Sequence, residues 1–212
     1  MNKQIPELSF VDIEKGDSNS INILSDALED HGFFSITEHG LSNELVDKCY
    51  QLSKQFFNLE YETKNKYSSV GSKGARGYTP KGIETAVGEN VPDQKEFWHH
   101  GPVVDDTFDQ KIPKNIIIEE MPEFNKYYDE LYLELHKIGS RVLSVIALSL
   151  EIDKNFFTPW IEKGNSLLRS IHYPPVDSNL NPHRARAHED INLITLLIGA
   201  EEGGLELSLI HI

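Results

Sequence analysis

Apolar residues recur at helical spacing in two long stretches of the chain, residues 42–58 and 121–152. Side chains three and four residues apart lie on one face of a helix. The apolar stripe of the first stretch consists of Leu45, Cys49, Leu52 and Phe56. The stripe of the second consists of Phe124, Tyr127, Tyr128, Leu131, Leu135, Ile138, Val142 and Ile146. Both stretches are therefore predicted to be helices that pack one face into a core.

Two shorter helices are expected as well. Ser18-Asn19-Ser20 offers side chains that cap a helix over residues 21–30, and His31-Gly32 ends it, since glycine accepts the left-handed conformation found after helices. A short helix is also predicted within residues 153–160.

The rest of the apolar pattern is typical of strands. β-prone runs predict strands at residues 5–13, 33–37, 96–102 and 167–173, the last ending at Pro174-Pro175, and later at 188–197 and 205–212. The glycine-spaced run 68–80 lacks the strand and helix that flank a phosphate-binding loop, so a surface loop is predicted there. The pattern is helical and mixed up to about Trp160 and β afterwards. This change predicts two regions, 1–160 and 161–212.

Composition narrows the class of protein. Apolar residues make up 39% and charged residues 25% of the 212, as in an ordinary globular protein. A formal net charge of −14 argues against nucleic-acid binding, which needs clustered Lys and Arg. The single cysteine, Cys49, excludes an internal disulfide framework. No apolar run is long enough to cross a bilayer and no signal peptide is visible, so a cytoplasmic protein is expected.

His188 and Asp190 are the strongest candidates for metal-binding residues in the sequence. In a strand, side chains at positions i and i+2 project from the same face, so the two can point at one centre. An imidazole and a carboxylate are two of the three ligands of the 2-His-1-carboxylate triad that holds non-haem Fe(II). A zinc hydrolase is a weaker alternative, because the chain has no His-Glu-x-x-His helix.

The remaining histidines favour other roles. His99 and His100 are adjacent, so they face opposite sides of a strand, and structural or substrate-facing roles are favoured over metal binding. A further group flanks the candidate site and has two open interpretations, contacts to an anionic substrate or solvated loop residues. This group consists of His172, His183, Arg184 and Arg186.

Several motifs, in the same order along the chain, resemble the isopenicillin-N-synthase-like family of iron(II)/2-oxoglutarate-dependent oxygenases. The N-terminal motifs are Glu29-Asp30-His31-Gly32-Phe33-Phe34 and His39-Gly40. The central ones are Arg76-Gly77-Tyr78 and Lys95-Glu96-Phe97-Trp98. The last ones are Ile171-His172-Tyr173-Pro174-Pro175, His188-Glu189-Asp190 and Leu193-Ile194-Thr195-Leu196-Leu197. Each motif is weak by itself, whereas the ordered set is specific.

The resemblance implies an α+β fold in which helices flank a distorted double-stranded β-helix, or jelly roll. It implies that His188 and Asp190 bind Fe(II), and that Tyr173 and Arg169 face 2-oxoglutarate or the substrate. A solvated strand position is the alternative for Arg169. The implied enzyme is a dioxygenase that couples decarboxylation of 2-oxoglutarate to the oxidation of a small molecule by O₂.

The resemblance also implies residues that this chain does not supply. In the family, a second iron-binding histidine and an Arg-x-Ser pair for 2-oxoglutarate lie well downstream of the His-x-Asp motif. Gly203-Gly204-Leu205-Glu206 begins like the family's next strand, but the likeness ends at about Ser208. His211 is not expected to replace the missing ligand, because it lies in a terminal segment that would fray. The sequence thus predicts that only the first half of the β-helix is present, and the alternative to an enzyme is a non-catalytic fragment or binding module.

Overall fold

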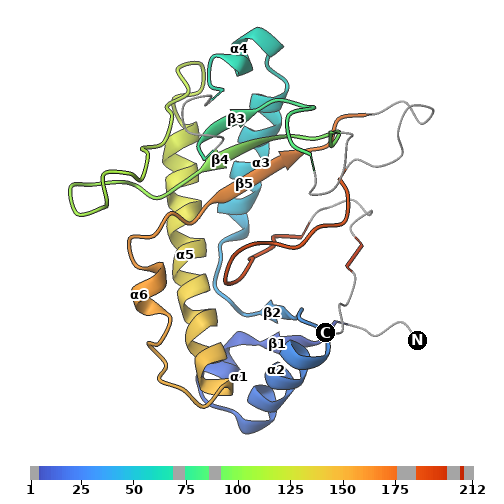
Figure 1. Cartoon of the computed structure of the whole chain (residues 1–212), viewed down its shortest axis with the longest axis vertical. Coiled ribbons are helices and arrows are strands. Elements are labelled where there is room, and N and C mark those ends of the chain that lie inside the picture. The colour runs from blue at the N-terminus through green and yellow to red at the C-terminus, as the bar shows by residue number, and fades with distance from the viewer. Residues whose placement is uncertain (1–4, 69–74, 86–91, 176–184, 200–205, 208–212) are drawn as a thin grey trace. The chain divides into compact units, whose positions relative to one another are not determined.

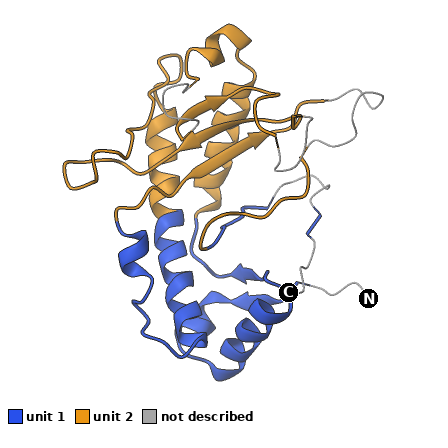
Figure 2. Ribbon diagram, viewed as in Figure 1, with its two compact units in different colours: residues 1–41, 135–162, 194–212 blue, residues 42–134, 163–193 orange. Residues whose placement is uncertain are grey.

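The computed structural model describes residues 5–68, 75–85, 92–175, 185–199 and 206–207 (Figure 1). These residues form two compact units, which Figure 2 distinguishes by colour. Unit 1 consists of Met1–Leu41, Leu135–Glu162 and Ile194–Ile212, and unit 2 of Ser42–Glu134 and Lys163–Leu193. Helix α5 (Phe124–Ser149) contributes its first part to unit 2 and its last part to unit 1. The division of the chain into regions 1–160 and 161–212 stays a prediction.

Unit 1 begins with a small βαβ arrangement. Strand β1 (Glu7–Ser9) pairs in parallel with β2 (Ser35–Thr37), and Leu8 lies opposite Ile36. Helices α1 (Phe10–Glu14) and α2 (Ser18–Asp30) lie between these strands in the chain. Parallel strands need such a crossover, because a tight turn reverses the direction of the chain and can join only antiparallel strands.

The strand predicted for residues 5–13 is wrong in its second half, where the chain turns into α1. The hydroxyl of Ser9 accepts a hydrogen bond from the backbone N–H of Asp12 and so caps the helix. Phe10 and Ile13, three residues apart, are then both fully buried. A helical turn buries this pair on one face, whereas a strand would point the two side chains to opposite sides.

The core of unit 1 joins the N-terminal elements to the second half of α5. Its buried residues are Leu8, Phe10, Ile13, Leu24, Ile138, Val142, Val145 and Ile146. Ile194 and Leu196, from the extended segment near the end of the described chain, are partly buried and pack against this core. The short helix α6 (Thr158–Ile161) also belongs to unit 1, and Phe157 before it contacts the same core.

Unit 2 is built on a three-stranded antiparallel sheet with the order β3-β4-β5 (Figure 1). The strands are β3 (Gly77–Thr79), β4 (Glu96–His100) and β5 (Leu168–His172). Helix α3 (Asn43–Phe57) and the first part of α5 pack on one face of this sheet, and the short α4 (Tyr61–Asn65) follows α3. The fully buried Trp98 of β4 joins the layers, since its ring lies 5.0 Å from that of Phe56 and 5.2 Å from that of Phe124.

The long helices agree with the sequence pattern. The predicted stripe of α3 is buried throughout, and Ser42 caps the helix through the backbone N–H of Leu45. Helix α2 ends as expected at His31, with Gly32 in the left-handed region at φ 69°. None of the helices in the described part of the chain has both the length and the apolar character that a bilayer crossing needs.

The predictions for residues 68–80 and 205–212 also differ from the structure. The loop predicted for residues 68–80 contains β3, because Gly77, Tyr78 and Thr79 pair with His99, Trp98 and Phe97 of β4. The strand predicted for residues 205–212 falls largely outside the described residues, and Glu206 and Leu207, which are described, are not in a strand.

Candidate metal and cofactor site

His188 and Asp190 lie in residues 185–193 of unit 2, which form no strand. The strand predicted for residues 188–197 is therefore wrong. A strand needs a hydrogen-bonded neighbour, and the ladders in the described residues join only β1 to β2 and β3 to β4 to β5, apart from one isolated bridge between Ser68 and Tyr78.

The two side chains nevertheless face each other. His188 Nε2 lies 3.8 Å from Asp190 Oδ1, and both side chains are half exposed. An imidazole nitrogen and a carboxylate oxygen are thus brought together at a position that solvent and small molecules can reach.

The backbone sets the tautomer of His188. Its Nδ1 lies 2.8 Å from the carbonyl oxygen of Arg186. A carbonyl only accepts hydrogen bonds, so Nδ1 carries the proton, and in the neutral ring the lone pair is on Nε2. The nitrogen that faces Asp190 is the one able to bind a metal, and the Arg186 carbonyl is the kind of outer partner that orients metal-binding histidines.

These residues fit a divalent metal as two of its ligands. Metal bonds of about 2.1 Å from each donor reach across a gap of this size. Within the described ranges, no group of three or more His, Cys, Asp or Glu side chains is arranged to hold a metal. The third position of a facial triad therefore has no protein ligand in the described part of the chain, and His211 lies outside that part.

Arg169 lies on β5, where neighbouring side chains hold its guanidinium. Its Nε donates to His99 Nε2 at 2.6 Å, and an Nη lies 3.4 Å from the carboxylate of Glu84. The guanidinium carbon lies 4.5 Å from the centre of the Phe97 ring. Its side chain is about one third exposed, so Arg169 is neither freely solvated nor closed off from a ligand.

Tyr173 directly follows β5 and is 38% exposed. Side chains alternate along a strand, so Arg169 and Ile171 lie on the same face of β5, and Tyr173 is the first residue beyond the strand. The role of Arg169 and Tyr173 in binding 2-oxoglutarate stays a prediction.

His99 and His100 occupy opposite faces of β4, as predicted. His99 lies beside Phe97 and Arg169. His100 is fully buried on the other face, where its Nε2 lies 2.7 Å from Asp129 Oδ1 and its ring packs edge-on against Tyr128. His100 therefore has a structural role between the sheet and α5.

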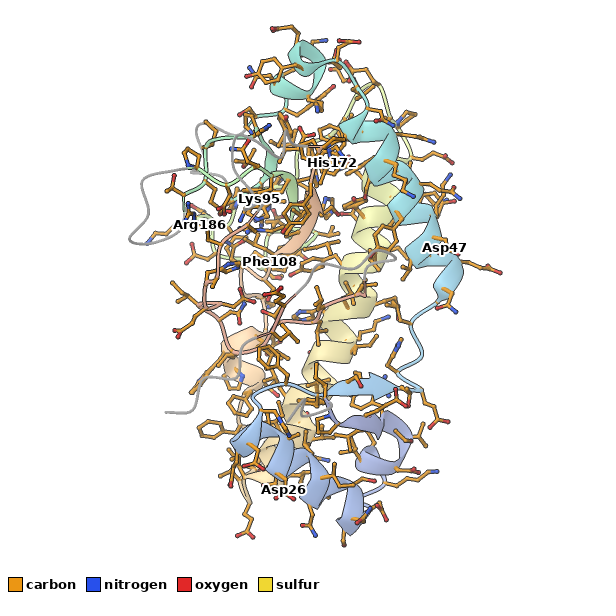
Figure 3. All side chains as sticks on the ribbon, turned by 90° about the vertical axis from the view of Figure 1, so that its right-hand side faces the viewer. Asp26, Asp47, Lys95, Phe108, His172 and Arg186 are labelled. Atoms are coloured by element: carbon orange, nitrogen blue, oxygen red, sulfur yellow. The ribbon has the colours of Figure 1, made fainter. Side chains whose placement is uncertain are left out.

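The structure also contains a buried polar cluster that sequence reasoning missed. Glu96 accepts hydrogen bonds from Lys64 Nζ at 2.8 Å and from the Tyr78 hydroxyl, and His172 Nδ1 lies 2.8 Å from its other oxygen. Burial raises the pKa of Glu96, but the donors from Lys64, Tyr78 and His172 outweigh it and hold this pKa below its ordinary value. His172, labelled in Figure 3, is thereby a partner of Glu96 and not a freely solvated residue.

In the sequence, Tyr78, Glu96 and His172 each belong to a motif of the family resemblance, but nothing in these motifs indicates that the three side chains meet. The partners of Glu96 are 18 to 76 residues away in the chain, and no local pattern connects them.

Comparison with known proteins shows the protein family to which this chain belongs. Residues 5–120 match the family model described as "non-haem dioxygenase in morphine synthesis N-terminal". The match covers more than half of the 212 residues. The chain therefore belongs to this family of non-haem dioxygenases, which confirms the resemblance drawn from its motifs.

Curated relatives carry related names. The chain is 28% identical over 205 residues to the 2-oxoglutarate-dependent dioxygenase ucsF of Acremonium sp, covering 88% of this chain and 60% of the relative. It is 30% identical over 202 residues to the 2-oxoglutarate-Fe(II) type oxidoreductase ppzD of Metarhizium rileyi, covering 87% and 56%. The chain thus spans little more than half the length of these relatives.

Solved structures agree on the fold. A 2OG-Fe(II) oxygenase family protein from Caulobacter crescentus superposes with a TM-score of 0.74 at 35% identity, over 84% of this chain and 59% of that one. A full-length Neurospora crassa protein, solved in complex with alpha-KG, superposes with a TM-score of 0.68 at 23% identity, over 84% and 57%. The chain accordingly has a mixed helix-and-sheet structure of the 2OG-Fe(II) oxygenase type.

Proposed function

We propose that this chain belongs to an Fe(II)- and 2-oxoglutarate-dependent dioxygenase that oxidises a small molecule with O₂. Membership of the non-haem dioxygenase family supports the activity class. The single observation in this chain that carries the proposal is that Nε2 of His188 faces the Asp190 carboxylate at 3.8 Å, while its Nδ1 is held by the Arg186 carbonyl.

His188 and Asp190 hold Fe(II) in this proposal, with the Arg186 carbonyl fixing the imidazole. The iron, when bound, supplies the centre at which the 2-oxo acid and O₂ react. Arg169 and Tyr173 bind 2-oxoglutarate or the substrate from the face of β5. Arg169 suits a carboxylate because Glu84 and His99 hold its guanidinium in place, so little conformational entropy is lost on binding.

The fold proposal follows the same family. Strand β5 is the beginning of a distorted double-stranded β-helix, with 161–212 as the first part of the β-helix domain and 1–160, which contains β3 and β4, as the helical and mixed region. The antiparallel pairing of β4 with β5 and the helices on one face of the sheet support this assignment.

Titration of the chain with Fe(II) and 2-oxoglutarate under anaerobic conditions tests the proposal. We expect a bound chromophore that requires both additions, and release of succinate when O₂ is admitted. His188→Ala and Asp190→Ala should each weaken iron binding by more than the roughly 10–100-fold that loss of an outer partner costs.

Matched controls are His31→Ala and Asp47→Ala, which remove the same residue types elsewhere and should leave iron binding unchanged. Iron binding that survives the double change of His188 and Asp190 to Ala would rule out this metal site.

A binding module without catalysis is the second candidate, and one observation favours it. The described residues supply two metal ligands where the facial triad has three. Binding of iron and 2-oxoglutarate without succinate release would identify this alternative.

A further inference from the structure

A cavity of about 330 Å³ opens in unit 2 beside α4, well away in the sequence from His188 and Asp190. Its floor is formed by Lys64, Tyr78 and Glu96, and its rim includes Tyr61, Lys81 and Ile83. We call it the Lys64 cavity. Its volume falls at the lower end of the range for small-molecule sites.

The Lys64 cavity and Arg169 use opposite faces of the sheet. Glu96 pairs across the strands with His172, and Tyr78 pairs with Trp98, so these four side chains share the face that the helices cover. Arg169 pairs with His99 and projects from the other face. None of the four residues proposed for iron and 2-oxoglutarate lines the cavity, although Pro174, which follows Tyr173, does; the cavity is therefore a different site.

The floor of the cavity is buried and charged. Lys64, Tyr78 and Glu96 are 7%, 2% and 6% exposed. Glu96 uses both of its oxygens, one with His172 and the other with Lys64 and Tyr78. The Lys64 ammonium has three N–H groups, and two of them have acceptors among the described residues, the Phe57 carbonyl at 3.0 Å and Glu96 at 2.8 Å. The third N–H of Lys64 is therefore the hydrogen-bond donor that the floor can offer to a ligand.

The rim adds a second cation and apolar walls. Lys81 is exposed, and no carboxylate of a described residue pairs with it. The cavity thus contains two ammonium groups and one carboxylate, in a chain whose formal net charge is −14. Tyr61 and Ile83 are 54% and 67% exposed, so an aromatic ring and an aliphatic side chain flank the opening.

We propose that the Lys64 cavity binds a small organic anion, a carboxylate with an aromatic or aliphatic body. The carboxylate accepts from Lys81 and from the remaining N–H of Lys64, and the apolar body lies against Tyr61 and Ile83. A cationic ligand is excluded by the two ammonium groups, and a fully apolar one would leave the buried donor without an acceptor.

Benzoate is the probe, titrated into the ¹⁵N-labelled full chain without Fe(II) or 2-oxoglutarate. We expect saturable shifts of the backbone amides of Tyr61 and Ile83, with a Kd on the order of 1 mM for a ligand of this size. Benzamide, which has the same shape without the charge, should bind at least about tenfold more weakly.

Lys81→Glu and Tyr61→Ala change the exposed rim and leave the buried Lys64–Glu96 pair intact. Each should raise the Kd of benzoate, by about tenfold for Lys81→Glu. Lys111→Glu is the matched control, since it makes the same charge change at an exposed lysine outside the cavity, and it should leave the Kd unchanged.

Absence of saturable binding, equal binding of benzamide, or equal effects of Lys81→Glu and Lys111→Glu would each overturn the proposal. The titration contains no iron, so its result is independent of the dioxygenase proposal, and either can fail while the other holds.

Discussion

Glu96 is a residue on which three distant segments of unit 2 converge. Lys64 comes from α4, Tyr78 from β3 and His172 from β5, and all three contact its carboxylate. A buried carboxylate is costly unless it is paired and hydrogen-bonded, and here every oxygen has a partner. The cluster therefore fixes how α4 and the three strands meet.

Glu96→Gln should destabilise the protein by about 3 kcal/mol at neutral pH, because it leaves the Lys64 ammonium buried without its counter-charge. The folded-state pKa of Glu96 is below its ordinary value of 4.5. Its contribution is then fully present above about pH 4.5 and is lost as the pH falls through the lowered folded-state value. The stability difference between the wild-type chain and the Glu96→Gln variant should therefore shrink on acidification.

Urea unfolding at about pH 7 and about pH 3 measures this difference. Glu62→Gln, at an exposed position of α4, is the control and should have little effect at either pH. A difference of equal size at both pH values would show that the charge of Glu96 is not what stabilises the cluster.

At the scale of elements, strand β3 depends on a close contact between its first residue and the backbone of Tyr67, which only glycine permits at that position. Gly77 has φ 75°, and a Cβ placed on it would lie 2.4 Å from the carbonyl oxygen of Tyr67 and 2.6 Å from Ile116 Cδ1. The Tyr67 carbonyl also accepts a hydrogen bond from the backbone N–H of Tyr78, at 3.0 Å, so it cannot move away without losing this contact. The strand is thus held between β4 and Tyr67, which lies just after α4.

Gly77→Ala should lower the free energy of unfolding by about 3 kcal/mol or more, because the strain of a left-handed backbone at alanine adds to the steric overlap with Tyr67. Gly82→Ala is the matched comparison, since Gly82 has φ 82° with no atom within 4 Å of its Cβ position. It should cost about 1 kcal/mol from strain alone. Equal losses in denaturant unfolding would mean that the overlap at Gly77 is relieved elsewhere.

At the scale of the whole molecule, the extended segment near the end of the described chain is used unevenly. Ile191, in unit 2, is 99% exposed, whereas Leu196, five residues later and in unit 1, is partly buried against the core of that unit. Leu196 Cδ1 lies 3.4 Å from the position that a Cβ on Gly139 of α5 would take. The leucine therefore packs against α5 at a residue that has no side chain.

Leu196→Ala should lower the free energy of unfolding by about 2 kcal/mol, at the lower end for a leucine, since its site is only partly buried. Ile191→Ala should change it by less than about 0.5 kcal/mol, because it removes no buried contact. Thermal or urea unfolding of the two variants checks this, and equal losses would contradict the packing of this segment.

The sequence by itself determined the features that depend on neighbours in the chain. The apolar stripes predicted α3 and α5, His31-Gly32 placed the end of α2, and alternation placed His99 and His100 on opposite faces. The predicted start of α2 at residue 21 is wrong, because Asp17 caps the helix through the backbone N–H of Ser20 and Ser18 already belongs to it. The short spacing of His188 and Asp190 brought the two side chains together even without a strand. The order of the motifs gave the family.

The tertiary structure decided what depends on distant partners. The chain turns into α1 after Ser9 because Phe10 and Ile13 are buried together, and β3 forms within a glycine-rich run because β4 pairs with it. Residues 188–197 have strand-like composition but form no strand, since backbone groups need a partner to make a ladder. The Glu96 cluster and the Arg169–His99 contact join residues that are 18 to 76 positions apart, and only packing brings them together, because no short-range preference connects them.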